Sequence, residues 1–120
     1  MMTALTAMDV SNASMYDGAS SLAEAVLMVV RSKKKSKSRK RLIPKTVHPN
    51  YRKTTNAIVN GQNIELVDVD YDLSSGTTSL DAFIDNADGD ITAVVIQQPN
   101  FFGSLEQVDE ITDWAHENNI

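Results

Sequence analysis

A short run of small residues near the N-terminus could bind a phosphate group. Gly18, Ala19 and Ser20 follow Asp17, which can cap a helix, and they precede an apolar segment at residues 22–30. Small side chains leave the first amide N–H groups of a helix accessible, and the helix dipole attracts an anion to them. These residues therefore predict a phosphate site at a helix N-terminus. An ordinary N-cap is the alternative, and the local pattern alone favours it.

His48 is the second residue that could carry chemistry. Pro49 keeps it out of the helical conformation and can itself begin a helix, so His48 is expected between a strand and a helix. Its imidazole could act as a base, bind a metal ion or stack on an aromatic ligand, and a purely structural role also stays open. No metal is expected, because the other histidine, His116, falls on a distant predicted helix. A nucleophilic triad is not expected either, since the chain has no G-x-S-x-G elbow.

A third unusual segment, residues 97–103, follows a β-branched run that predicts a strand. It contains Gln98, Pro99 and Asn100 before two phenylalanines. In an open α/β sheet, ligands bind beyond the carboxyl ends of the strands, where this segment and His48 are both expected. The predicted phosphate site could face the same side. Together the three segments favour a phosphate-bearing ligand more strongly than the first segment does by itself.

The elements that would hold these segments alternate between helices and strands. Such an alternation predicts an α/β fold with right-handed crossovers and a mainly parallel sheet. Pro44 is expected to place its strand at a sheet edge or to start it, whereas the apolar run at 91–97 predicts a fully buried strand. The last helix should bury one face that includes Leu105. The predicted helices cover residues 18–30, 51–59, 79–85 and 105–118, and the predicted strands cover residues 42–47, 64–70 and 91–97.

The length and charge of the chain limit the classes of function. A chain of 120 residues without cysteine fits one modest domain in the cytoplasm, and no apolar run approaches the roughly 20 residues that span a bilayer. The net charge of -5 hides an asymmetry, because all 11 lysines and arginines lie between Arg31 and Lys53. Residues 31–41 could bind nucleic acid, but they offer no aromatic side chain to stack on a base. A solvated basic loop is therefore expected, with no nucleic-acid partner.

Three segments taken together resemble the P-protein of the glycine cleavage system. They are NASMYDGAS at residues 12–20, VHPNY at residues 47–51 and VIQQPNFFG at residues 95–103. The likeness is closer still to the first subunit of the two-subunit glycine dehydrogenase (decarboxylating). The resemblance implies part of the large domain of a fold-type I pyridoxal-phosphate (PLP) enzyme, with residues 1–120 as a single incomplete domain and 31–41 as a basic loop within it.

The resemblance also implies roles for five residues. Gly18, Ala19 and Ser20 would hold the phosphate of PLP, His48 would stack on its pyridine ring, and Asn100 would border the active site near the substrate. No catalytic residue and no metal ligand is implied in this chain, because the lysine that binds PLP covalently would come from the second subunit.

The implied reaction is the decarboxylation of glycine, followed by transfer of the aminomethyl group to the lipoyl arm of H-protein. A fragment of this length is expected to be inactive by itself. The alternative is a non-catalytic α/β module that binds a phosphate ligand, or binds nucleic acid through the basic band at residues 31–53.

Overall fold

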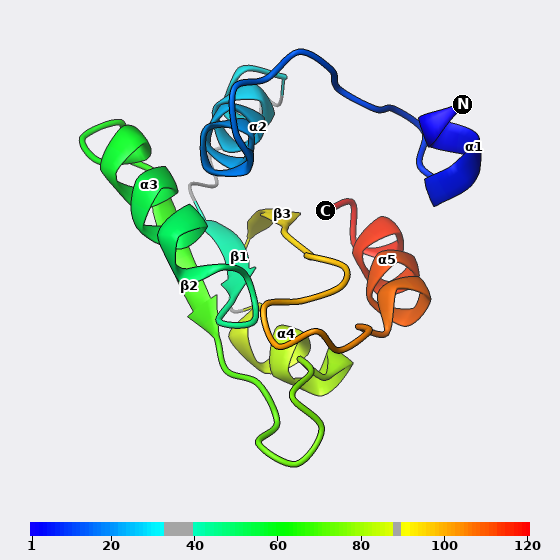
Figure 1. Ribbon diagram of the computed structural model, residues 1–120. Coiled ribbons are helices and arrows are strands. Elements are labelled where there is room, and N and C mark those ends of the chain that lie inside the picture. Colours follow the sequence, from blue (N-terminus) through cyan, green and yellow to red (C-terminus); the bar gives the residue numbers. More distant parts are fainter. Residues whose placement is uncertain (33–39, 88–89) are drawn as a thin grey trace.

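The computed structural model describes residues 1–32, 40–87 and 90–120, and helices alternate with strands along it (Figure 1). The predicted α/β class is confirmed. The helices are α1 (Met2–Thr6), α2 (Gly18–Ser32), α3 (Pro49–Val59), α4 (Leu80–Asn86) and α5 (Val108–Glu117). The strands are β1 (Lys40–Pro44), β2 (Glu65–Val69) and β3 (Ile91–Val94).

The three strands form one parallel sheet in the order β2-β1-β3. Helices cover both faces of this sheet. Successive side chains of a strand point to opposite faces, and neighbouring residues of β2 pack against different helices. Leu66 of β2 packs with α2 and α3, whereas its neighbour Val67 packs with α4 and α5. One hydrophobic core therefore lies on each face. The first contains Val26, Leu27 and Val59, and the second contains Leu42, Val69, Phe83, Ile91 and Ile111.

Pro44 does not mark a sheet edge, so that prediction is wrong. It is the last residue of β1, the central strand, and it lies opposite Val69 of β2. The carbonyl of Leu42 accepts a hydrogen bond from the amide of Val95, so the backbone groups of Leu42 point toward β3. The direction alternates along a strand, so the backbone nitrogen of Pro44, two residues later, points toward β3 as well. The pairing of β1 with β3 has ended by then, and the sheet needs no N–H group at Pro44.

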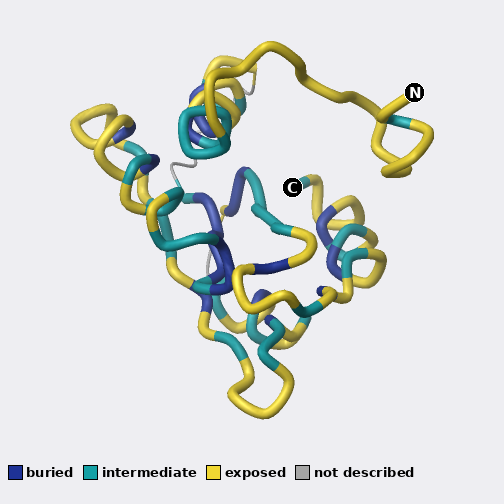
Figure 2. Tube along the Cα trace, viewed as in Figure 1, coloured by how far each residue is buried: buried dark blue, intermediate teal, exposed yellow. Residues whose placement is uncertain are grey.

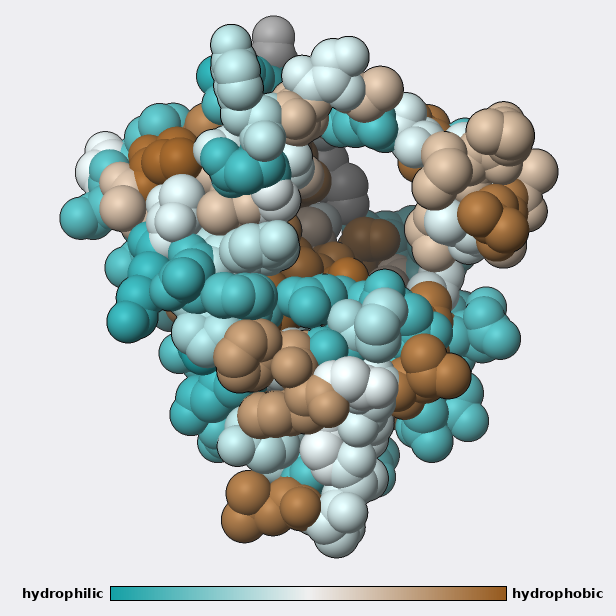
Figure 3. All heavy atoms as spheres, viewed as in Figure 1, coloured by the Kyte–Doolittle hydropathy of each residue, from teal (hydrophilic) through white to brown (hydrophobic). Residues whose placement is uncertain are grey.

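The predicted fully buried strand at 91–97 is also wrong. β3 ends at Val94, and only Ile91 and Thr92 are buried in it. Among the described residues β3 pairs with β1 alone, and its second edge lines an apolar groove of about 360 Å³ between α2 and α5. Figure 3 shows hydrophobic atoms in the hollow between these helices.

The last helix begins three residues later than predicted. Leu105 precedes α5 and is 71% exposed, whereas Ile111 and Ala115 form the buried side of the helix. Leu105 matches the helical spacing of the apolar residues of α5, and the sequence pattern therefore extended the helix to it. The side chain of Glu106 instead turns toward the preceding loop, where it accepts a hydrogen bond from the amide of Thr78 (2.9 Å).

The N-terminal segment lies apart from both cores. α1 has no buried residue, and residues 7–17 run exposed to the start of α2 (Figure 2). The predicted basic loop falls mainly on residues 33–39, which lie outside the described residues. Of its flanks, Arg31 lies in the last turn of α2, while Arg41 is buried in β1 with 1% exposure. No helix within the described ranges has both the length and the apolar character to cross a bilayer.

Replacing Leu42 by Ala tests the core around the central strand. Leu42 is fully buried, so truncation should lower the free energy of unfolding by about 2–5 kcal/mol. Urea denaturation followed by fluorescence of Trp114, the single tryptophan, measures this. Leu105→Ala is the matched control and should change stability by less than about 0.5 kcal/mol, because that leucine is exposed. Equal effects of the two substitutions would contradict this description of the core.

Candidate functional site

The N-terminus of α2 is capped by Asp17, as the sequence predicts. One carboxylate oxygen of Asp17 accepts from the amide of Ser20 (2.7 Å), and the other accepts from the Ser20 hydroxyl (3.2 Å). Within the part of the chain that the structure describes, the amides of Gly18 and Ala19 donate no hydrogen bond. Two of the three predicted phosphate-binding amides are thus available, and that of Ser20 would have to exchange its partner.

Gly18 lies against the side chain of Tyr51, a residue of α3. A Cβ atom built on Gly18 would stand 2.6 Å from Cζ and 2.8 Å from Cε2 of Tyr51, with the hydroxyl oxygen closer still. Real Cβ contacts do not occur at such distances. Any larger residue at position 18 would therefore displace the tyrosine ring or separate α2 from α3.

His48 is the N-cap residue of α3, and contacts on several sides fix its position. Its Nδ1 atom accepts from the amide of Asn50 (3.1 Å), and its own amide donates to Oε1 of Gln97 (2.9 Å). In a neutral imidazole with this hydrogen bond, the proton lies on Nε2. The ring stacks on Tyr51, with centroids 4.8 Å apart and planes at 18°, and meets Phe101 at 5.0 Å and 69°.

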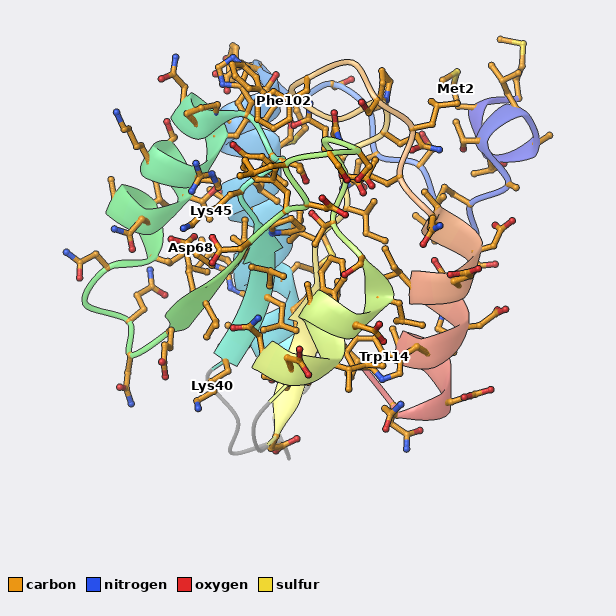
Figure 4. The ribbon with its side chains drawn as sticks, turned by 90° about the horizontal axis from the view of Figure 1, so that it is seen from below. Met2, Lys40, Lys45, Asp68, Phe102 and Trp114 are labelled. Atoms are coloured by element: carbon orange, nitrogen blue, oxygen red, sulfur yellow. The ribbon has the colours of Figure 1, made fainter. Side chains whose placement is uncertain are left out.

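The three segments singled out in the sequence thus come together through side chains. Gly18 touches Tyr51, Tyr51 stacks on His48, and His48 contacts Phe101. The amide of Phe101 also donates to the carbonyl of Thr46 (2.8 Å), just beyond β1. Figure 4 shows the neighbouring Phe102 at the end of the sheet opposite Lys40, the first residue of β1. The contacts therefore lie beyond the carboxyl ends of the strands.

Tyr51 and Phe101 have no role in the sequence prediction, although a signal for Tyr51 exists. It stands three residues after His48, and residues three apart are neighbours on a helix. Phe101 has no comparable signal, because its contact with His48 joins segments more than fifty residues apart in the chain.

Asn100 is buried, and its carboxamide holds the loops together. Its Nδ2 donates to the Gly76 carbonyl (2.7 Å) and to Oε1 of Glu106 (2.8 Å), and its Oδ1 accepts from the amides of Phe102 and Ser104 (3.0 Å each). Because its donors and acceptor are used within the chain, Asn100 acts here by placing Phe101, the next residue, against His48. Contact of its side chain with a substrate stays a prediction.

Glu106, two residues before the start of α5, completes the same hydrogen-bond network. Its carboxylate accepts from the Thr78 amide (2.9 Å) and from Asn100, and its own amide donates to Oε1 of Gln98 (2.6 Å). The side chain is nearly buried, at 8% exposure, so these donors offset the loss of hydration of its charge. Residues 76–78 and 98–106 are consequently tied into one unit.

Asn100→Ala tests this network. The substitution removes four hydrogen bonds and leaves the carboxylate of Glu106 with one donor fewer, so it should lower the free energy of unfolding by about 2–4 kcal/mol. Urea denaturation measures the loss. Asn118→Ala is the control, since the carboxamide of that exposed residue makes one hydrogen bond, to the Trp114 carbonyl. An Asn100→Ala variant as stable as Asn118→Ala would contradict the anchoring role.

Asp72 gives the adjoining loop a dependence on pH. Its Oδ1 accepts from the amide (2.8 Å) and the hydroxyl (2.7 Å) of Ser74, and these bonds lower the pKa of Asp72 below its ordinary value of 3.8. Its contribution to stability is therefore present above pH 3.8 and is lost as the pH falls through the lower pKa of the folded state. The difference in urea midpoint between the wild type and Asp72→Ala should shrink from neutral pH to about pH 2. A difference that grows on acidification would contradict this sign.

Comparisons with known proteins agree with these features. The family model for the glycine cleavage system P-protein matches residues 1–120. Proteins named probable glycine dehydrogenase (decarboxylating) subunit 1 are 58% identical over 120 residues in Alcanivorax borkumensis, 60% over 116 in Thioalkalivibrio sulfidiphilus and 61% over 115 in Nitrosospira multiformis. The matches cover 96–100% of this chain but only 25–26% of these relatives, so the chain spans about a quarter of their length.

A solved structure gives the same result for the fold. The crystal structure of a glycine decarboxylase (P-protein) of the glycine cleavage system, in inhibitor-bound form, superposes with a TM-score of 0.80 at 33% identity. The match covers 98% of this chain and 25% of that one. The chain therefore belongs to the glycine cleavage system P-protein family.

Proposed function

We propose that this chain forms part of a PLP-dependent glycine dehydrogenase (decarboxylating) subunit in the glycine cleavage system. The enzyme would release CO2 from glycine and pass the aminomethyl group to the lipoyl arm of H-protein in the cytoplasm. The observation that carries the proposal is the contact of His48 with both Tyr51 and Phe101 at the strand ends of a chain of the P-protein family.

The residues present fit the phosphate and the ring of PLP. The amides of Gly18 and Ala19 begin a helix of 15 residues and donate to no described group, so they can bind two phosphate oxygens with the helix dipole behind them. His48 offers a planar ring for the pyridine. When bound, PLP supplies an electron sink for the electron pair that remains as CO2 leaves.

The surroundings of His48 would keep its ring in one orientation. The Asn50 amide and the Gln97 side chain fix the residue at two points, and Tyr51 occupies one face of the ring. A ligand ring would therefore be met by a surface that needs little reorganisation on binding. The remaining phosphate contact, by Ser20, would form once Asp17 turns its carboxylate away from the Ser20 amide.

The lysine that would bind PLP covalently is assigned to a second subunit. Lys45 lies near the strand ends (Figure 4), but its ammonium group pairs with Asp70 at 2.6 Å. The hydrogen bond and charge of Asp70 raise the pKa of Lys45, and an ammonium group that keeps its proton is a poor nucleophile. The relatives are named subunit 1, which accords with a partner chain.

The alternative function, nucleic-acid binding by the basic band at residues 31–53, gains no support. Arg41 is buried in β1, and Lys45 and Arg52 lie next to the carboxylates of Asp70 (2.6 Å) and Asp68 (3.6 Å). These three cations thus do not join a continuous basic surface.

His48→Asn tests the proposal in the full-length subunit assembled with its partner. Asparagine can still cap α3, so the substitution removes the ring with little loss of local structure. We expect binding of PLP, followed by its absorbance, to weaken about tenfold through loss of the ring contact. Glycine-dependent exchange of CO2 should fall with it.

His116→Asn is the matched control, because His116 lies exposed on α5 away from the strand ends. It should leave the absorbance and the exchange rate unchanged. A wild-type assembly with neither PLP absorbance nor glycine-dependent exchange would overturn the proposed function. Normal PLP binding by His48→Asn would overturn only the ring contact.

A further inference from the structure

We propose that Tyr51 is a positioning residue of the PLP site and that it favours glycine at position 18. The proposal rests on the function proposed above. In it, the tyrosine ring fixes the helix N-terminus that would bind the phosphate relative to the imidazole that would stack on the pyridine.

The first step is the contact between Tyr51 and Gly18. The hydroxyl end of the tyrosine reaches the first residue of α2 so closely that no Cβ atom fits there. Gly18 is not among the residues with positive φ, so its backbone conformation is open to alanine. The neighbouring ring, and not the backbone, therefore favours glycine at this position, because a Cβ atom would require the ring to shift.

The second step is the stack between Tyr51 and His48. The two rings lie nearly parallel, at 18°, with centroids 4.8 Å apart. The imidazole cannot turn toward Tyr51 while this ring is in place. One side chain thus contacts both the phosphate-binding turn and the predicted ring-stacking residue.

The third step is the rigidity of the support beneath Tyr51. Tyr51, Thr55 and Val59 recur every four residues of α3 and so lie along one side of the helix. Thr55 and Val59 are buried, and Val59 packs in the same core as Val26 and Leu27 of α2. The position of the tyrosine ring is consequently set by the packing of two helices rather than by a loop.

A double-mutant cycle tests the contact with position 18. Gly18→Ala should lower the urea midpoint of the wild type, because its methyl group collides with Tyr51. In a Tyr51→Leu background the same change should cost nothing or raise the midpoint, since alanine favours helix over glycine. An equal effect of Gly18→Ala in both backgrounds would overturn the assignment of Gly18.

PLP titration of the assembled enzyme, followed by absorbance, tests the positioning role. Tyr51→Leu should weaken binding at least about tenfold and shift the absorbance maximum, as expected for a displaced ring contact. Tyr51→Phe keeps the stacking ring and should stay within about twofold of the wild type. Ile58→Ala is the control, because Ile58 is an exposed residue of the same helix, and it should leave affinity and spectrum unchanged.

The outcomes separate this proposal from the proposed function. Wild-type affinity and spectrum in Tyr51→Leu would overturn the positioning role while the function stands. Absence of PLP binding in the wild-type assembly would overturn both. If Tyr51→Leu does not assemble, Tyr51→Phe decides, because a tenfold loss with the ring retained would contradict positioning by stacking.

Discussion

The close approach of the first turn of α2 to Tyr51 is the constraint on which the rest of the site depends. α2 and α3 share the core on one face of the sheet, and their contact at the strand ends is closed by a glycine and an aromatic ring. The same ring stacks on His48, the N-cap residue of α3. The distance between the N-termini of α2 and α3 therefore also sets the distance between the predicted phosphate site and the predicted ring-stacking residue. Packing on one face of the sheet thereby determines geometry at its end.

Phe101 places a second constraint on His48. Phe101 stays partly exposed, so its own burial contributes little to holding it. The buried carboxamide of Asn100 and the carboxylate of Glu106 hold the loop instead, through hydrogen bonds to residues 76, 78, 102 and 104. An apolar contact at the surface is thus positioned by a polar network beneath it. This explains why a polar residue stands inside the loop.

The sequence predicted which segments meet, but not how they meet. Parallel strands bring their carboxyl ends to one edge, so the proximity of His48 to residues 97–103 followed from the alternation of helices and strands. Local pattern also placed the cap at Asp17 and put His48 just before a helix, although α3 begins at Pro49, two residues earlier than the predicted helix at residues 51–59. The contacts of Gly18 with Tyr51 and of His48 with Phe101 join residues distant in the chain, and no local propensity encodes them. The prediction that Pro44 marks a sheet edge was wrong for the same reason. Only the structure shows that the pairing of β1 with β3 ends before Pro44, so the missing N–H group breaks no hydrogen bond of the sheet.

Asp17 would give the proposed phosphate site two states. The carboxylate of Asp17 accepts hydrogen bonds from the amide and hydroxyl of Ser20 and caps the first turn of α2. A phosphate group at the same amide would bring two anions to one helix end, where they repel each other. The phosphate could bind the amides of Gly18 and Ala19 alone. Otherwise the Ser20 amide would release the Asp17 carboxylate and bind the phosphate, which would then cap the first turn in its place. In both cases the Ser20 amide keeps a hydrogen-bond partner before and after binding, so the first turn of α2 can be preformed without leaving Ser20 unbonded.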